Sequence, residues 1–520
     1  NDEWVRFAAI ESLGRIGDAR ATGPLLALMQ SDPWLLFPLV EALGQVGDAE
    51  VGQSLRAYLN DENPMLVHAT IAALGRIDAR HGSHFLETLP PESEPLLIEA
   101  LSTEDPAARR AAVTALGWVG GEASVSHLLP HLDDEVEEVQ EATEQALGHL
   151  GSRHLTVLLE TFQEPSADYR PQLAQVLGRI KQPEAVRALC QALHDDAGPV
   201  RVAAAASLGQ AADRSATGPL IERLTDPLPQ VREAVAAALG YLRSTAAITP
   251  LLALLGDRHP EVRHQASQAL ASIGTREVIA LLSPLVRAEQ AESREAAIHT
   301  LSLVENKLAD EPIVEALGSP DAVVRRFAAS ILGRRHVTRA LPALLAALID
   351  EDWQVRKLVA EALGLLGEPH ALPALRTTLQ DGNLWVRYAA AHALGEIGDP
   401  GAVEALLERL LHDADPVKLA ATAALGKLRA AQAIPALKLA SHHADGDIRK
   451  AVAEALGAIT TAAAWEVLID LLEDPEASVR LSALQALGRT GAQSASERVA
   501  PLQNDPDPRV RQAAHTLLER

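Results

Sequence analysis

The chain has 520 residues, of which 48% are hydrophobic but only 3% aromatic, so its apolar content comes from the aliphatic and small side chains that suit closely packed helices. Its formal net charge of −24 argues against partners that are bound chiefly through phosphates, such as nucleic acids. No stretch reaches about 18 uninterrupted apolar residues, so we expect no membrane insertion. The single cysteine, Cys190, fits a reducing compartment, so we expect a cytoplasmic protein.

The chain opens inside a helix. Asp2 leads directly into what the rest of the sequence identifies as the second helix of a repeated unit, and no polar capping repeat is recognisable. Stacked repeats need capped ends to stay soluble. We therefore expect further domains of the same polypeptide beyond the N-terminus.

One leucine recurs along the whole chain, and we call these residues the marker leucines. Thirteen of the sixteen intervals between them are 31 residues, two are 30 and one is 42. Gly follows the marker in fourteen of seventeen cases, and Arg stands seven residues before it in thirteen. A period this regular predicts a stacked array. The marker leucines are Leu13, Leu43, Leu74, Leu116, Leu147, Leu177, Leu208, Leu239, Leu270, Leu301, Leu332, Leu363, Leu394, Leu425, Leu456, Leu487 and Leu518.

Each unit reads as a pair of helices. Apolar residues lie eight, four and one before Leu487, on one helix face, and Asp474-Pro475 predicts the start of that helix, with Asp as its cap and Pro in its first turn. Residues 402–411 typify the other helix of a unit, after a short turn at 398–400. Neither helix can bury its apolar stripe alone. The predicted fold is therefore all-α, an α-solenoid (superhelix) of about 17 helical hairpin repeats of 31 residues.

The 42-residue interval marks the one real irregularity of the array. It contains the breaker-rich segment PPESEP at 90–95, which cannot continue a helix. We place an insertion at 81–95, between N-terminal repeats at 1–80, the first of them truncated, and a continuous array at 96–520. A hinge and an added contact loop both remain open for it.

These repeats resemble the HEAT-like repeats of the phycobilisome-lyase (PBS lyase) type. Residues 385–399, WVRYAAAHALGEIGD, and residues 4–18, WVRFAAIESLGRIGD, carry the resemblance almost throughout. The resemblance covers nearly the whole chain and implies that the helix with the marker leucine lines the concave side of the superhelix. Such repeats serve enzymes, enzyme subunits and scaffolds alike, so the resemblance specifies fold more than function.

Catalytic members of this broad class leave no signature here. The sequence has no His-Glu dipeptide, which excludes a metal site like that of deoxyhypusine hydroxylase. His127 and His131 have the i, i+4 spacing of metal ligands on a helix, but solvated histidines explain them better. A bilin lyase could use Tyr241, Tyr388 and Asp168, which are ordinary residues for solvent-facing helix positions. We expect no enzyme activity, no catalytic residues, no cofactor and no metal.

The arginine seven residues before each marker leucine has two interpretations. It could form a binding ladder, or it could brace the stack, since this position borders the core face and a guanidinium can reach acceptors in the neighbouring repeat. We favour the structural role. The basic residues two after the marker leucines, such as Arg15 and Arg76, are interrupted by Tyr241, Leu365 and Glu396, so they form no continuous track for nucleic acid.

Two clusters of large side chains stand out on the face opposite the core. Positions nine, five and two before the marker leucine and two after it lie within about 60° of one another on a helical wheel, flanked by position six. Small or polar residues dominate this face, and exposed aromatic clusters tend to be contact sites. Packing against neighbouring helices is the alternative, chiefly for the first cluster. The predicted partner-binding residues are Trp4, Phe7, Trp34, Phe37, Met65 and His68 in the first cluster, and Phe327, Trp353, Leu358, Trp385, Tyr388 and His392 in the second.

These observations together predict a binding scaffold or regulatory adaptor that holds a protein or peptide partner on its concave face. The alternative is a subunit of a phycobilin lyase-like or other cofactor- or protein-modifying enzyme.

Overall fold

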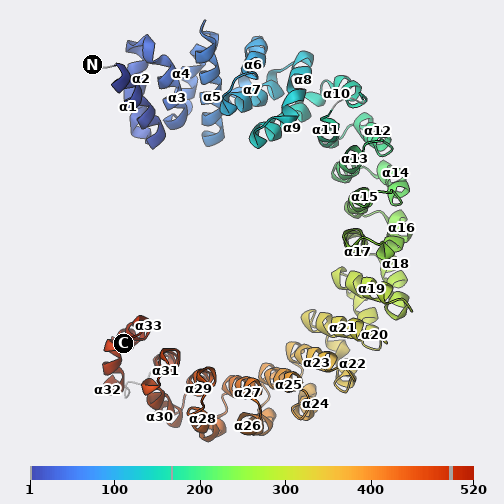
Figure 1. Ribbon diagram of the computed structural model, residues 1–520, viewed down its shortest axis with the longest axis vertical. Helices are drawn as coiled ribbons and strands as arrows, with labels where there is room; N and C mark the ends of the chain where they lie inside the picture. The colour runs from blue at the N-terminus through green and yellow to red at the C-terminus, as the bar shows by residue number, and fades with distance from the viewer. Residues whose placement is uncertain (1–2, 165–167, 491–495, 520) are drawn as a thin grey trace. The chain divides into compact units, whose positions relative to one another are not determined.

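The computed structural model describes residues 3–164, 168–490 and 496–519, and this part of the chain contains helices and no β-strand. The helices form successive antiparallel pairs, and within each of the two compact units described below, neighbouring pairs pack on one another (Figure 1). The predicted all-α solenoid of helical hairpins is confirmed.

Every marker leucine lies in one series of helices, which we call the marker helices. Their bounds are α1 (Glu3–Ile16), α3 (Leu36–Val46), α5 (Pro64–His81), α7 (Pro106–Val119), α9 (Glu137–Gly151), α11 (Arg170–Ile180), α13 (Gly198–Ala211), α15 (Pro229–Tyr241), α17 (Pro260–Ile273), α19 (Ala291–Leu303), α21 (Ala322–Arg334), α23 (Trp353–Leu366), α25 (Leu384–Ile397), α27 (Asp415–Lys427), α29 (Gly446–Ile459), α31 (Ala477–Thr490) and α33 (Pro508–Leu518).

The second series consists of shorter helices that precede the marker helices, many of them flanked by 3-10 turns. Their bounds are α2 (Thr22–Ser31), α4 (Ala49–Leu55), α6 (Glu94–Ala100), α8 (Glu122–Leu128), α10 (Leu155–Phe162), α12 (Pro183–Ala192), α14 (Thr217–Arg223), α16 (Ile248–Ala253), α18 (Arg276–Leu282), α20 (Asp310–Ala316), α22 (Leu341–Ala347), α24 (Leu372–Thr378), α26 (Val403–His412), α28 (Ile434–Ala440), α30 (Ala462–Asp470) and α32 (Ser496–Val499).

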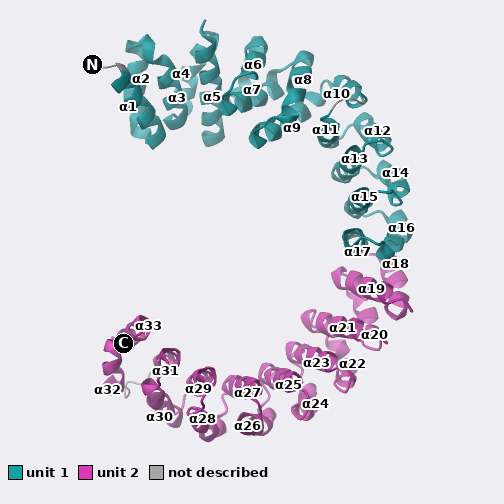
Figure 2. Cartoon of the chain, viewed as in Figure 1, with its two compact units in different colours: residues 1–273 teal, residues 274–520 magenta. Residues whose placement is uncertain are grey.

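The chain divides into two compact units, residues 1–273 with α1–α17 and residues 274–520 with α18–α33 (Figure 2). Within each unit the marker helices form the row on the concave side, as the family resemblance implied. The insertion predicted at 81–95 lies inside the first unit. It contains two 3-10 turns, η4 (Leu86–Thr88) and η5 (Pro91–Ser93).

The marker leucines form the core of the stack within each unit. Fifteen of them, from Leu43 to Leu487, are at most 1% exposed. The two exceptions are Leu13, which is 37% exposed, and Leu518, which is half-buried. These two lie in the first and last marker helices, each of which packs against a marker helix on one side only.

The glycine after the marker leucine is a packing residue rather than a helix cap. A Cβ built on Gly364 would lie 2.8 Å from the Cα of Ala393, the residue before the next marker leucine, and the same close approach recurs between Gly395 and Ala424. The absence of a side chain therefore lets neighbouring marker helices touch. Helix ends are instead formed by residues with positive φ, such as Gly367 and Gly398.

The start of the marker helix differs from the prediction at Asp474-Pro475. The helix α31 begins at Ala477, so Pro475 lies before it rather than in its first turn. Asp474 does not cap the helix. Its carboxylate accepts the N–H of Glu476 within the preceding turn, and it also receives a guanidinium from the repeat before it.

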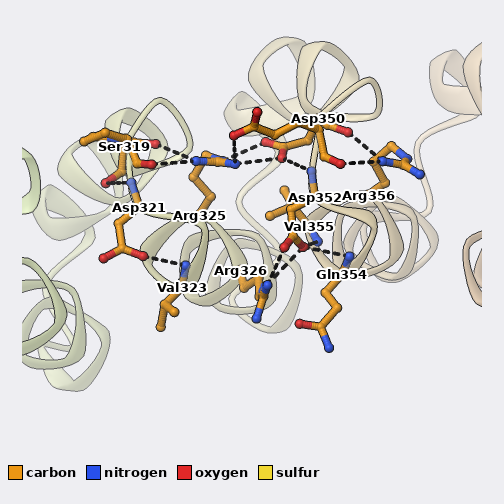
Figure 3. Close-up of polar contacts among 12 residues, drawn as sticks. Ser319, Asp321, Val323, Arg325, Arg326, Asp350, Asp352, Gln354, Val355 and Arg356 are labelled. Carbon is orange, nitrogen blue, oxygen red and sulfur yellow. Dashed lines mark hydrogen bonds and ion pairs between the residues drawn. The ribbon is translucent and has the colours of Figure 1, made fainter. Parts of the chain in front are cut away.

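That guanidinium belongs to a ladder of ion pairs, and we call each pair a rung. The rungs are largely buried, except for Arg6–Asp32, whose arginine side chain is 44% exposed. In the rung of Figure 3, Nε and Nη2 of Arg325 donate to the two carboxylate oxygens of Asp350 at 2.7 and 2.8 Å, while Nη1 donates to the carbonyl of Ser319. The carbonyl of Asp350 in turn accepts Nη1 of Arg356, so this aspartate links two arginines. The structural role predicted for the arginine is confirmed.

The rung recurs through both units with a spacing of 25 residues between arginine and aspartate, extended to 26 or 27 in three pairs. This spacing places the aspartate thirteen residues before the next marker leucine, a repeated position that the sequence analysis did not recognise. The pairs with the spacing of 25 are Arg109–Asp134, Arg170–Asp195, Arg201–Asp226, Arg232–Asp257, Arg325–Asp350, Arg356–Asp381, Arg449–Asp474 and Arg480–Asp505, and the longer ones are Arg6–Asp32, Arg294–Asp321 and Arg387–Asp413.

The ladder changes where the sequence changes. Lys418 stands in an arginine position, and the residue 25 later is His443 rather than aspartate, with 3.5 Å between the lysine Nζ and the histidine Nε2. Arg263 is followed 25 residues later by Ala288, so the sequence supplies no carboxylate there. The boundary between the two compact units falls between Arg263 and Ala288.

Acid is expected to weaken the rungs. Burial acts to raise the pKa of Asp381, but hydrogen bonds from Arg356 and from the N–H of Asn383 outweigh it and hold this pKa below the ordinary aspartate value. Asp134, Asp257 and Asp413 have lowered pKa values for the same reasons. A group whose pKa is lower in the folded state contributes stability above its unfolded pKa, and this contribution is lost as the pH falls through its folded pKa.

We therefore expect the melting temperature of the full chain to fall steeply between about pH 5 and about pH 2, since unfolded aspartates titrate near 3.9. Circular dichroism melts at a series of pH values measure this. Between about pH 6 and 8 these carboxylates should leave the melting temperature unchanged. A melting temperature that stays constant or rises on acidification would contradict the assignment.

Candidate partner-binding surface

The exposed stripe of the marker helices agrees with the prediction in part. Residues two before the marker leucine, such as His392 and Gln485, are exposed. Residues five before it are largely covered, as Ala389 and Ala420 show, because they lie one turn from the alanine that contacts the preceding glycine. The position five residues before the marker leucine therefore lies beside the contact between neighbouring marker helices. Leu358, which was predicted to bind a partner, occupies this position and is half-buried.

Four aromatic side chains of the second cluster come from three consecutive marker helices of the second unit. Phe327 lies in α21, Trp353 begins α23, and Trp385 and Tyr388 lie in the first turns of α25. Trp385 is 45% exposed and Phe327 46%, whereas Tyr388 is half-buried. We call these four residues the aromatic surface.

Trp385 and Tyr388 form a corner on this surface. Their ring centroids are 6.0 Å apart and their planes meet at 68°, an edge-to-face arrangement that stabilises both rings. Asn383 caps the helix beneath them by accepting the N–H of Trp385, and Asp352 caps α23 next to Trp353 by accepting the N–H groups of Gln354 and Val355. The helices that carry these aromatic rings thus both have a side-chain cap at the N-terminus.

Charged groups lie at the other end of α25. Glu396 accepts a hydrogen bond from Nζ of Lys427 at 2.5 Å and lies 3.5 Å from Nε2 of His392. The hydrogen bond from Lys427 holds the pKa of Glu396 below its usual range. His392 is exposed although it lies near Glu396, so its ring can make a polar contact with the edge of a bound partner.

The first cluster lies in the first unit, on α1, α3 and α5 and on the 3-10 turn η2 (Pro33–Leu35). Trp34 on η2 is 90% exposed, and Trp4 and Met65 are also largely exposed. The rings of Trp4 and Phe7 lie 6.3 Å apart. The remaining predicted residues, Phe37 and His68, are half-buried, so this cluster is a mixture of packed and protruding side chains.

The described residues offer little for catalysis. His127 lies in α8 and His131 in the 3-10 turn η6 (Leu129–Asp133), so the assumption that one helix carries both is wrong. His131 bonds the rung carboxylate Asp134, and no group of three or more His, Cys, Asp or Glu is placed to hold a metal ion in the described ranges. Burial raises the pKa of the Cys190 thiol, which makes it a poor nucleophile.

No helix in the described residues is long and apolar enough to cross a membrane.

The family comparisons agree with the repeat pattern. A family model described as HEAT repeats matches residues 86–148, 155–227, 217–302, 311–383, 350–426, 415–485 and 466–519, and one described as PBS lyase HEAT-like repeat matches residues 5–31. A curated relative, the uncharacterized phycocyanin operon protein Z of Pseudanabaena tenuis, is 32% identical over 161 residues, which cover 29% of this chain and 74% of the relative.

Many solved structures are similar to this chain. Kap121p bound to RanGTP has a TM-score of 0.53 at 15% identity, and the match covers 82% of this chain and 56% of that one, so this chain spans little more than half of its length. The complex of CpcE and CpcF of phycocyanin lyase from Nostoc sp. PCC7120 is 26% identical, with a TM-score of 0.31 and coverage of 41% of this chain and 95% of that one.

Proposed function

Because the chain belongs to the HEAT-repeat family, whose model matches most of its length, we propose that it is a protein-binding scaffold that holds a protein or peptide on the row of marker helices and catalyses no reaction itself. The observation that carries this proposal is the aromatic surface of Phe327, Trp353, Trp385 and Tyr388. Kap121p, which has a similar solenoid, is solved bound to RanGTP, and this supports the proposal.

The physical argument rests on composition and spacing. Only 3% of the chain is aromatic, yet four aromatic residues gather on neighbouring helices of one face. Packed helices lie about 8–10 Å apart, so one extended segment or one partner helix can touch all three marker helices. Large aromatic side chains supply much contact area with few rotatable bonds, which is why they dominate binding hot spots.

Replacing both Trp385 and Tyr388 with alanine tests the proposal. The partner is first identified by affinity capture with the full chain, and is then purified and titrated against both proteins by calorimetry. Truncating a true anchor costs about 2 kcal/mol or more, so we expect the Kd to rise about 30-fold or more. The melting temperature should change little, because half-exposed residues contribute little to folding.

The matched control is Tyr241→Ala, which removes a 75% exposed ring that lies outside both clusters. This variant should bind the partner as the unmodified chain does. The proposal fails if the double variant binds normally, and in particular if it binds normally while unfolding several degrees earlier, since the rings would then be packing residues.

A second candidate function is that of a subunit of a phycobilin lyase-like enzyme. The 32% identity to a phycocyanin operon protein favours it. The test is to incubate the chain with a phycobilin and unmodified phycocyanin subunits and to follow visible absorbance. A bilin that binds this chain, or whose transfer to phycocyanin this chain accelerates, supports the second candidate over the first.

A further inference from the structure

The insertion builds one wall of a hollow on the concave row of the first unit. The Asp78 carboxylate in α5 accepts the N–H groups of Phe85 and Leu86, both at 2.8 Å. Phe85 and Leu86 are buried, and the Phe85 ring lies so close to Gly52 that a Cβ there would be 2.3 Å from its Cε2. The insertion is therefore packed into the stack at this point.

The hollow has a volume of about 400 Å³ and lies between the insertion and the helices α5, α7 and α9. Small residues line it, namely Gly75, Ala79, Ala111 and Ala142. Leu86 adds an apolar side. A hollow with a small-residue lining accepts the methylene chain of a long side chain, and polar groups around it select the head group.

The polar groups around the hollow are mainly anionic. Glu138 and Glu141 project from α9, both exposed, and neither has an ion-pair partner in the described chain, whereas Glu144 on the same helix pairs with Arg179 at 2.7 Å. Asp78 and Glu87 also line the hollow.

The cationic groups are fewer. Arg110 lines the hollow and forms no ion pair with another residue of the described ranges. His84 bonds the carboxylate of Glu87 at 2.8 Å, and this bond raises the pKa of the histidine. Four carboxylates against one guanidinium and one imidazole leave the hollow with negative charge, and the chain as a whole carries −24.

We propose that this hollow takes an arginine or lysine side chain from a loop of a partner protein, with the stem along the alanines and the head group between Glu138 and Glu141. Two carboxylates three positions apart on one helix can receive the several N–H groups of a guanidinium. The guanidinium of Arg110 can donate to a carbonyl of the same loop. This site is separate from the aromatic surface and does not depend on it.

The test uses the full chain and a fluorescein-labelled pentapeptide, Gly-Arg-Gly-Arg-Gly, whose binding is followed by fluorescence anisotropy at about 0.15 M salt, where the field of distant charges is largely screened. The first variant is Glu138→Gln/Glu141→Gln. Its control is Glu292→Gln/Glu295→Gln, because these residues stand nine and six before Leu301 as Glu138 and Glu141 stand before Leu147.

We expect the first variant to raise the Kd about ten-fold and the control to change it less than about two-fold, since the first pair lines the hollow beside the insertion and the control pair lies in the other unit. Equal losses in the two variants would mean that the peptide responds to the general negative charge, and would overturn the proposal. Failure of the peptide to bind the unmodified chain, or its displacement by an equal concentration of spermidine, would also overturn it.

A second pair of variants tests the shape at constant charge. Ala142→Phe fills the hollow, and Ala296→Phe makes the same change at the same position before Leu301. We expect only Ala142→Phe to abolish peptide binding. Circular dichroism establishes that both variants are folded. Normal binding by a folded Ala142→Phe variant would overturn the assignment, and the glutamine variants decide the matter if this one does not fold.

Discussion

Replacing Asp381 with alanine is expected to lower the free energy of unfolding by about 3 kcal/mol, the lower end of the cost of breaking a buried ion pair by removing one partner. The Asp381 side chain is 12% exposed and that of Arg356 18%. The substitution leaves the guanidinium of Arg356 with its bonds to backbone carbonyls but without its carboxylate, and it also deprives the N–H of Asn383 of its acceptor. Urea denaturation of the full chain, followed by circular dichroism, measures the loss.

Two controls separate the rung from ordinary surface pairs. Glu361→Ala removes the partner of Lys357 in a pair where both side chains are about a third exposed, and should cost less than about 1 kcal/mol. The double variant Arg356→Met/Asp381→Leu removes both charges, and we expect it to recover much of the loss, because replacing a buried pair by apolar residues is often close to neutral. A double variant as unstable as Asp381→Ala, or a single variant with no loss, would contradict the role of the rung.

Replacing Gly364 with alanine is expected to destabilise the chain even though alanine is the better helix former. The new Cβ would lie 2.8 Å from the Cα and 2.9 Å from the Cβ of Ala393, so α23 and α25 must move apart. Overpacking costs about 1–3 kcal/mol, and the helix propensity of alanine returns about 1 kcal/mol, so we expect a net loss of up to about 2 kcal/mol.

The chain contains its own control for this change. Gly148 follows a marker leucine in the same way, but a Cβ there would meet no atom within 4 Å. Gly148→Ala should therefore stabilise the chain by up to about 1 kcal/mol, the opposite sign to Gly364→Ala. Urea denaturation measures both. Two substitutions with the same sign would show that helix propensity, rather than the close approach, decides the effect.

The sequence predicted the fold because single residues, above all the marker leucine, recur at a fixed spacing. A leucine every 31 residues with apolar neighbours specifies a helix face, and the face specifies the stack. The sequence analysis also placed the arginine correctly at the border of the core. It did not identify the aspartate partner, because a carboxylate before a helix is normally interpreted as a cap, as it was at Asp474.

The candidate surfaces were predicted less completely. A helical wheel gave the exposed positions two before and two after the marker leucine, but it could not show that position five is covered by the neighbouring helix, because that depends on how closely glycine lets the helices approach. The hollow beside Glu138 was not predicted at all. It exists because Asp78 fixes an irregular segment against α5 and α7, and no periodicity describes such a contact.

The rungs also constrain how such a chain can lengthen in evolution. A rung joins residues 25 to 27 apart in adjacent repeats, so duplication of a whole 31-residue segment reproduces both partners, whereas an insertion of more than one or two residues between them would displace the carboxylate. The insertion at 81–95 lies where the arginine position is held by Val67, and the residue 25 later, Glu92, is part of the insertion itself. Duplication of entire units therefore preserves the rungs, whereas the long irregular interval of this chain stands where the sequence supplies no arginine for a rung.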